Sequence, residues 1–166
     1  MKTLYLVRHA KSSWAAESQP DIDRPLNERG YADAHLVSKN LHKQKLRPDV
    51  IISSPAIRAI STALIFAGNL PYSKEDILIR PSLYESGREE YLTCIHAIDD
   101  SFSSAMLFGH NPTISETAAY LLPKYHEDMS TCCVIGIEFK VNSWQELLKN
   151  TGILSLQLTP STLKGD

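Results

Sequence analysis

Short apolar runs of strand length alternate with longer helical patterns along this chain, and this alternation restricts its fold more than any other feature. Strands are expected at residues 4–7, 49–53, 77–79, 104–108, 133–140 and 153–159. Helices are expected at residues 28–44, 55–68, 88–98 and 112–122. Strands that are apolar throughout and are separated by helices are typical of a mostly parallel sheet with helices on both faces. The sequence therefore predicts an α/β three-layer sandwich, and its 166 residues suit a single domain over residues 1–166.

Two of the expected helices begin with the same local signal. Ser54 precedes Pro55, and Asn111 precedes Pro112. A short polar side chain can accept a hydrogen bond from the free N–H groups of a helix start, and proline suits the first helical position. We therefore expect Ser54 and Asn111 to cap these two helices.

The charge balance and the apolar segments restrict the class of protein. Lysine and arginine total 17 against 19 aspartate and glutamate residues, which disfavours nucleic-acid and membrane-surface binding because such proteins usually carry a strong basic excess. No apolar stretch approaches the roughly 18 residues of a membrane span, and the N-terminal run is too short for a signal peptide. The three cysteines, of which Cys132 and Cys133 are adjacent, suggest reduced thiols. We expect a cytoplasmic protein; its oligomeric state is left open.

Polar side chains follow several of the expected strands. Arg8 and His9 end the first strand, Arg58 lies in the first turn of the helix after the second, and Glu85 and His110 follow the next two. Ligands of open parallel sheets bind beyond the carboxyl ends of the strands, so these residues are expected at one rim. Two arginines, two histidines and helix N-termini would form an electropositive pocket suited to a phosphoryl group.

Each of these residues also has an ordinary explanation when taken alone. Arg58 could lie on a solvated helix face, His110 could belong to a turn, and Glu85 could be an exposed carboxylate. The joint arrangement, and not any single member, indicates a phosphate site.

Five sequence blocks, in order along the chain, resemble those of SixA-type phosphohistidine phosphatases of the histidine phosphatase (phosphoglycerate mutase-like) superfamily. They are LVRHAKSSW at residues 6–14, DRPLNERG at 23–30, SSPAIRA at 53–59, LYE at 83–85 and GHNP at 109–112. The resemblance implies a phosphoglycerate mutase-like fold and a single histidine phosphatase domain. It also implies that His9 is the nucleophile and that Arg8, Arg58 and His110 bind the phosphate.

Two positions bear on how far the resemblance extends. The commonest motif of the superfamily is Arg-His-Gly, whereas Ala10 stands here, and alanine still leaves room for a phosphate. Glu85 lies where many relatives have a proton donor, but this carboxylate is not uniform in the SixA-type branch. Glu85 is therefore either the proton donor or a solvated carboxylate.

These residues predict a metal-independent phosphatase without cofactors. A neutral His9 would attack phosphorus and carry the phosphoryl group as phosphohistidine. Arg8, Arg58 and a protonated His110 would bind the oxygens on which the charge of the transition state resides. The histidines are otherwise dispersed, so no metal site is indicated.

Three functions remain in competition. The first is a phosphatase of phosphohistidine on another protein, favoured because the short chain has no long insertion to cover its pocket. The second is a phosphatase of small organic phosphate esters with the same mechanism. The third is a non-catalytic phosphate-recognition module, which is disfavoured because competent residues fill all four ligand positions. A mutase is disfavoured by the lack of lid-forming insertions, and no glycine-rich fingerprint follows the first strand as dinucleotide binding would require.

Overall fold

The computed structural model describes residues 1–14 and 18–165. Within these residues, six strands form one sheet in the order β3-β2-β4-β1-β5-β6. The strands are β1 (Lys2–Arg8), β2 (Val50–Ser53), β3 (Leu78–Ile79), β4 (Ser104–Gly109), β5 (Val134–Phe139) and β6 (Ile153–Leu158). β1, β4, β2 and β3 pair in parallel, while β5 runs antiparallel to both β1 and β6. The prediction of a mostly parallel sheet is confirmed.

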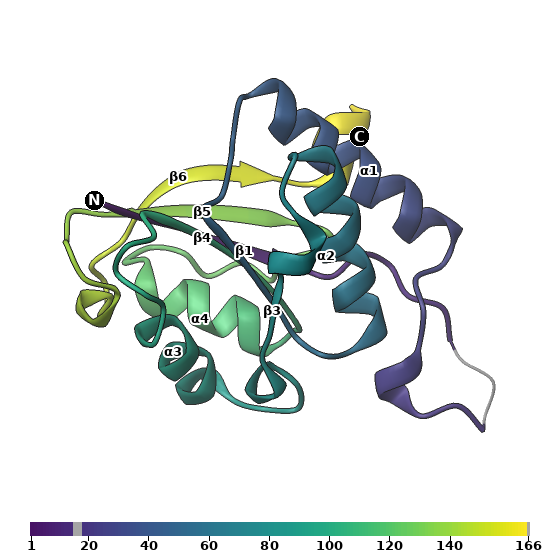
Figure 1. Cartoon of the computed structure of the whole chain (residues 1–166), viewed down its shortest axis with the longest axis horizontal. Coiled ribbons are helices and arrows are strands. Elements are labelled where there is room, and N and C mark those ends of the chain that lie inside the picture. The colour runs from purple at the N-terminus through teal and green to yellow at the C-terminus, as the bar shows by residue number, and fades with distance from the viewer. Residues whose placement is uncertain (15–17, 166) are drawn as a thin grey trace.

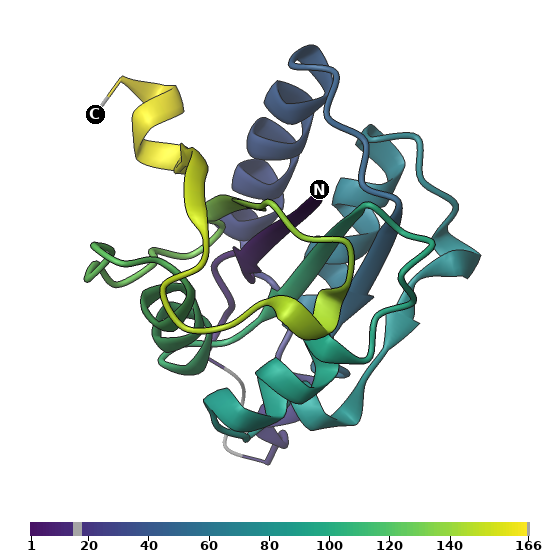
Figure 2. The same ribbon diagram turned by 90° about the vertical axis from the view of Figure 1, so that its left-hand side faces the viewer.

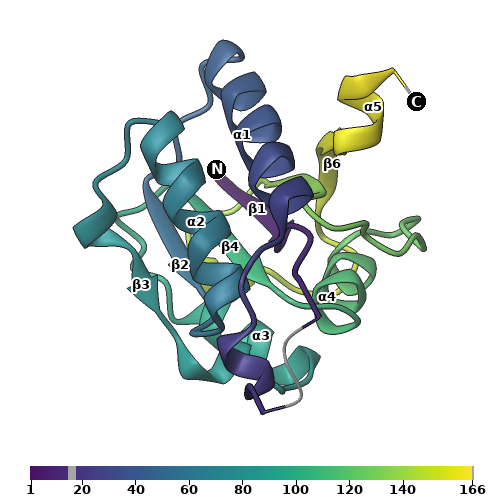
Figure 3. The ribbon, with the colours of Figure 1, turned by 90° about the vertical axis from the view of Figure 1, so that its right-hand side faces the viewer.

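Helices cover both faces of this sheet (Figure 1). They are α1 (Glu28–Lys43), α2 (Ile57–Asn69), α3 (Arg88–His96), α4 (Thr113–Leu121) and the short α5 (Pro160–Lys164), with 3-10 turns η1 (Asp21–Asp23), η2 (Lys74–Asp76), η3 (Pro81–Leu83) and η4 (Trp144–Glu146). α1 and α2 lie on one face, α3 and α4 on the other, and α5 follows β6 near α1 (Figures 2 and 3). The three-layer sandwich is therefore confirmed, and α5 is an addition to the expected helices. In the part of the chain that is described, no helix is both long and apolar enough to cross a membrane.

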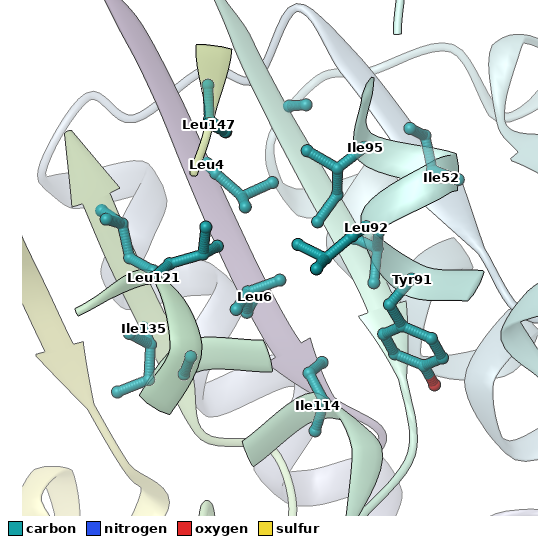
Figure 4. Packing of buried hydrophobic residues seen from close by; sticks show 14 of the residues in the cluster. Leu4, Leu6, Ile52, Tyr91, Leu92, Ile95, Ile114, Leu121, Ile135 and Leu147 are labelled. Carbon is teal, nitrogen blue, oxygen red and sulfur yellow. The ribbon is translucent and has the colours of Figure 1, made fainter. Parts of the chain in front are cut away.

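Two apolar cores explain why the central strands are apolar throughout. Leu4 and Leu6 of β1 pack with residues of α3 and α4, including Leu92 and Leu121 (Figure 4). Val7 of the same strand belongs to the opposite core, which includes residues of α1 and α2. Because successive strand residues point to opposite faces, a strand that is covered on both sides has no solvent-facing position.

Two helices begin later than expected, and the predicted helix caps are wrong. α2 begins at Ile57 and α4 at Thr113, and neither has a side-chain cap. Instead, Ser54 Oγ lies 2.7 Å from Nε2 of His110, and the Asn111 amide donates to the carbonyl of Met129 at 3.0 Å. Ser54 Oγ also accepts the main-chain N–H of Ala56, the residue before α2, at 3.2 Å, but neither side chain accepts an N–H from the first turn of its helix.

The segment between β1 and α1 contains η1 and an isolated bridge between Ser12 and Leu26. Its residues 15–17 lie outside the described residues. This segment leads from the end of β1 to the start of α1 and carries Asp21, whose contacts are given below.

Candidate active site

The two predicted histidines meet because of the register between β1 and β4. Arg8 of β1 lies opposite Gly109 of β4 in the parallel ladder, so the two strands continue side by side as His9 and His110. The main-chain N–H of His9 donates to the carbonyl of Gly109 at 3.2 Å. The centroids of the two imidazole rings are 5.2 Å apart, and their planes are inclined at 54°.

The His9 ring is held by a carbonyl of its own chain segment. Nδ1 of His9 lies 2.7 Å from the carbonyl oxygen of Ala10. A carbonyl can only accept, so Nδ1 carries the proton and Nε2 keeps its lone pair. Burial, followed by the positive charge of nearby groups including Arg58, lowers the pKa of His9 to about 3. The ring is therefore neutral at neutral pH, as a nucleophilic histidine must be.

His110 is held from two sides and is also neutral. Its Nε2 pairs with Ser54 Oγ, and its main-chain N–H donates to the hydroxyl of Tyr91 at 3.0 Å. Burial, followed by the charge of Arg58, lowers the pKa of His110 to about 4. Burial disfavours the charged ring in this arrangement, and the protonated His110 expected in the transition state stays a prediction. A doubly negative phosphoryl group beside the ring would raise this pKa.

Arg58 lies in the first turn of α2, as predicted, and its terminal nitrogens donate to Asp21 of η1. Nη1 donates to the main-chain carbonyl of Asp21 at 2.8 Å, and Nη2 donates to its carboxylate at 3.0 Å. The same carboxylate accepts from Arg24 at 2.9 Å and from the hydroxyl of Tyr84 at 2.8 Å. These three hydrogen bonds, from Arg24, Tyr84 and Arg58, hold the pKa of the Asp21 carboxyl well below its usual range.

Arg8 is tied to the segment that precedes β5. Its Nη1 donates to the carbonyl of Met129 at 2.9 Å, the same oxygen that accepts from Asn111. Ser115 of α4 connects these groups, because its hydroxyl donates to the Asn111 side chain at 2.6 Å and accepts from the main-chain N–H of Met129 at 2.9 Å. Nε of Arg8 has no partner among the described residues. The guanidinium is thus oriented but retains free donors.

Four of the five predicted residues line one cavity of about 260 Å³, and Glu85 lines an adjoining one. The first cavity is lined by Arg8, His9, Lys11, Ser12, Trp14, Arg24, Arg58, His110, Asn111 and Thr131. The second, of about 190 Å³, shares Arg58 and His110 with the first and is also bordered by Asp21, Tyr84 and Glu85. The positive φ of Glu85, 50°, is uncommon for a residue with a side chain. Two larger cavities elsewhere contain none of the five predicted residues.

Side chains that could bind a metal ion do not cluster in the described part of the chain. Across residues 1–14 and 18–165, no group of three or more His, Cys, Asp or Glu side chains is arranged to hold a metal ion. Cys132 and Cys133 are buried free thiols that directly precede β5.

Comparison with known proteins identifies the family of this fold and site. The sequence model of the histidine phosphatase superfamily (branch 1) matches residues 4–93, more than half of the chain. The chain belongs to the histidine phosphatase superfamily. The matched part includes Arg8, His9, Arg58 and Glu85, while His110 lies beyond it.

Known proteins with different names resemble this chain. An uncharacterised chloroplastic protein of Arabidopsis thaliana is 30% identical over 159 residues, which span 91% of this chain and 72% of that protein. Phosphoserine phosphatase 1 of Hydrogenobacter thermophilus is 43% identical over 83 residues, which span 48% of this chain but only 38% of that enzyme. A crystal structure of an Agrobacterium tumefaciens protein, provisionally named phosphohistidine phosphatase SixA, is 30% identical. It superposes with a TM-score of 0.83 and covers 96% of this chain and 98% of that one.

These findings confirm the phosphoglycerate mutase-like fold and the resemblance to SixA-type proteins, and the expectation of a phosphatase is confirmed at the level of the superfamily. Four further residues contact the predicted ones and were not predicted from the sequence: Asp21, Ser54, Tyr84 and Tyr91. Tyr84 and Ser54 stand in two of the blocks that resemble the family, which was an available signal, and Asp21 stands two residues before the block at 23–30. Tyr91 had no such signal, because only the packing of α3 brings its hydroxyl to the end of β4.

Proposed function

We propose that this chain is a metal-independent phosphatase in which His9 is the nucleophile, and that its substrate is a phosphohistidine side chain on another protein. The observation that carries the proposal is the bond from Nδ1 of His9 to the Ala10 carbonyl, which leaves Nε2 unprotonated. This nitrogen belongs to a ring that lines the same cavity as Arg8, Arg58 and His110. We treat residues 1–166 as one histidine phosphatase domain.

The reaction proceeds in two displacements at phosphorus. In the first, the lone pair on Nε2 of His9 forms a bond to phosphorus while the bond from phosphorus to the leaving group breaks. The positive charge on the ring is stabilised by the bond from Nδ1–H to the Ala10 carbonyl. In the second, the oxygen of a water molecule bonds to phosphorus, and the P–Nε2 bond returns its electron pair to the ring. The released phosphate keeps the oxygen and one proton of the water molecule, and the other proton passes to solvent.

The arginines and His110 stabilise the charge that develops on the phosphoryl oxygens. Arg58 uses two of its five N–H groups on Asp21, so the guanidinium can be held in place and still donate to the substrate. Nδ1 of His110 has no partner among the described residues. It is the ring nitrogen left to donate to a phosphoryl oxygen once the anion has raised the pKa of His110.

Several features favour a phosphohistidine protein as the substrate. Imidazole departs from phosphorus more readily than an alkoxide does and needs less help from a proton donor. Glu85, the candidate donor, is exposed and lies in the adjoining cavity rather than beside His9. At the mouth of the site, the side chain of Trp14 is 89% exposed, as on a surface that meets another macromolecule. The three free thiols suit a reducing compartment, as the proposed cytoplasmic location requires.

The proposal is tested by trapping the intermediate. A turnover mixture quenched in alkali should yield acid-labile phosphate on His9, and His9→Ala should abolish both the label and phosphate release. His35→Ala, a change at an exposed histidine of α1, is the control and should leave both unchanged. A label on a serine or cysteine would overturn the mechanism.

A small organic phosphate ester is the second candidate substrate. It is supported by the 43% identity to a phosphoserine phosphatase over 83 residues and by the position of Glu85 in a cavity that His110 and Arg58 also line. A substrate panel separates the candidates. We expect kcat/KM for a phosphohistidine protein to exceed the values for phosphoserine and sugar phosphates, and the reverse order would favour the small ester.

A further inference from the structure

We propose that Thr62 is a positioning residue for the nucleophile, acting through the peptide group that follows His9. The inference deepens the proposed function and rests on the role of His9 in it. Thr62 lies on α2, is fully buried and does not line either cavity of the site. It therefore acts on the ring of His9 only through another group.

The hydroxyl of Thr62 joins the nucleophile segment to the first turn of α2. Its Oγ1 accepts the main-chain N–H of Ala10 at 3.0 Å and donates to the main-chain carbonyl of Arg58 at 2.7 Å. Both directions are defined, because an N–H can only donate and a carbonyl can only accept. One buried hydroxyl thus connects the segment that orients His9 with the residue that binds phosphate.

The peptide between His9 and Ala10 is held on its two sides. Its N–H donates to Thr62, and its carbonyl, that of His9, accepts from the main-chain N–H of Cys132 at 3.1 Å. The next carbonyl, that of Ala10, accepts from Nδ1 of His9. If this peptide rotates, the φ angle of Ala10 changes and the following peptide shifts with it. The carbonyl of that following peptide, that of Ala10, is the acceptor that fixes the tautomer of the imidazole and aims Nε2.

The bond from Thr62 to Arg58 alone would not indicate a role in catalysis. Threonine side chains in helices often donate to the carbonyl four residues earlier. Thr117 of α4 does so, donating to the carbonyl of Thr113 at 2.8 Å, and it is also fully buried. Within the described residues, however, the Thr117 hydroxyl accepts no N–H from outside its helix. The bond from Ala10 is what distinguishes Thr62, and Thr117 is a matched control.

The experiment compares Thr62→Val, Thr62→Ser and Thr117→Val in the full chain. We expect Thr62→Val to lower the single-turnover rate of His9 phosphorylation by p-nitrophenyl phosphate about 10- to 100-fold with little change in KM, as small misplacements of a reacting group do. Thr62→Ser should restore most of the rate, and Thr117→Val should leave it near the wild-type value. Nitrogen-15 NMR at pH 7 should show wild-type His9 protonated at Nδ1 only, and a mixture of tautomers in Thr62→Val.

Two results would overturn the inference: an unchanged rate and tautomer in Thr62→Val, or equal losses in Thr62→Val and Thr117→Val. If Thr62→Val does not fold, Thr62→Ala and Thr117→Ala replace the pair, because the smaller side chain cannot clash. The NMR measurement requires no turnover. It therefore still tests Thr62 if wild-type protein forms no phosphohistidine, the result that would refute the proposed function instead.

Discussion

The carboxylate of Asp21 lies 3.0 Å from Nη2 of Arg58, so a residue of the loop after β1 orients a guanidinium on α2. Arg58 is buried, whereas the side chain of Asp21 is 47% exposed and also binds Arg24 and Tyr84. The charge of the proposed phosphate ligand is therefore partly balanced by the protein itself.

Replacing Asp21 by asparagine should show separately how Asp21 orients Arg58 and how its negative charge affects anion binding. We expect Asp21→Asn to lower kcat about 10-fold, because Arg58 loses a charged partner that holds it in place. Binding of orthovanadate should not weaken, since the cavity becomes more positive. Steady-state kinetics with vanadate inhibition measure both quantities. Asp23→Asn is the control, at an exposed acidic residue of the same 3-10 turn, and an equal effect there would contradict the prediction.

Arg58 should serve the transition state more than the binding of the substrate. Arg58→Ala is expected to lower kcat by about 10²-fold or more, as loss of a transition-state donor does. Arg58→Lys should recover only part of this, because a point charge cannot form the same paired hydrogen bonds. Arg80→Ala, at an exposed arginine directly before η3, should leave kcat unchanged. A change in KM alone would mean that Arg58 binds substrate and transition state equally.

The two histidines should resist protonation. The pKa values of about 3 for His9 and about 4 for His110 lie below the ordinary 6.5, so neither ring should titrate between pH 8 and 5.5 by NMR. Orthophosphate should raise the pKa of His110. Because the unfolded chain takes up these protons near pH 6.5 and the folded chain does not, stability should decrease as the pH falls from about 6.5 towards 4. Thermal unfolding across this range measures the decrease, and a flat Tm would contradict it.

Glu85 distinguishes the two substrate classes. If its carboxyl is a proton donor, Glu85→Gln should reduce hydrolysis of an alkyl phosphate by about 10²-fold and affect phosphohistidine or an aryl phosphate much less. Glu89→Gln, at an exposed residue of α3, is the matched control. A small and equal effect on every substrate would make Glu85 a solvated carboxylate. A large and equal effect would assign it to the phosphate site.

The hydroxyl of Tyr91 should stabilise the fold as well as the site. It accepts the main-chain N–H of His110 and donates to the carbonyl of Leu83 at 2.9 Å. Tyr91→Phe leaves two buried groups unpaired and should reduce the free energy of unfolding by about 1–3 kcal/mol. Tyr125→Phe is the matched control, because this buried hydroxyl has no partner among the described residues. Its removal should change the free energy of unfolding little. Urea unfolding of both variants measures the difference, and similar losses would refute the prediction.

The sequence permits prediction of the sheet and of its polar rim because both follow from patterns along the chain. Arg8 and His9 could be placed together from their strand, and His110 from the rule that parallel strands end at one edge. The contacts of Ser54 and Asn111 could not be predicted, because the groups that cap a helix are the same groups that bind a neighbouring side chain. The charge of His110 depends on burial, and the bond between Asp21 and Arg58 depends on the loop conformation. Neither of these two features can be recognised from the residues adjacent in the sequence.

The pairing of Arg8 with Gly109 also determines what kind of change this architecture tolerates. Adjacent strands lie about 4.8 Å apart in any sheet, so the separation of the two histidines is inherited from the main chain and is insensitive to which apolar residues fill the strands. The fold can therefore persist while substitutions accumulate, as the TM-score of 0.83 at 30% identity illustrates. One residue gained or lost within β1 would instead turn His9 to the opposite face of the sheet. A change of length in either of the two central strands would therefore disturb the site more than replacement of their apolar side chains.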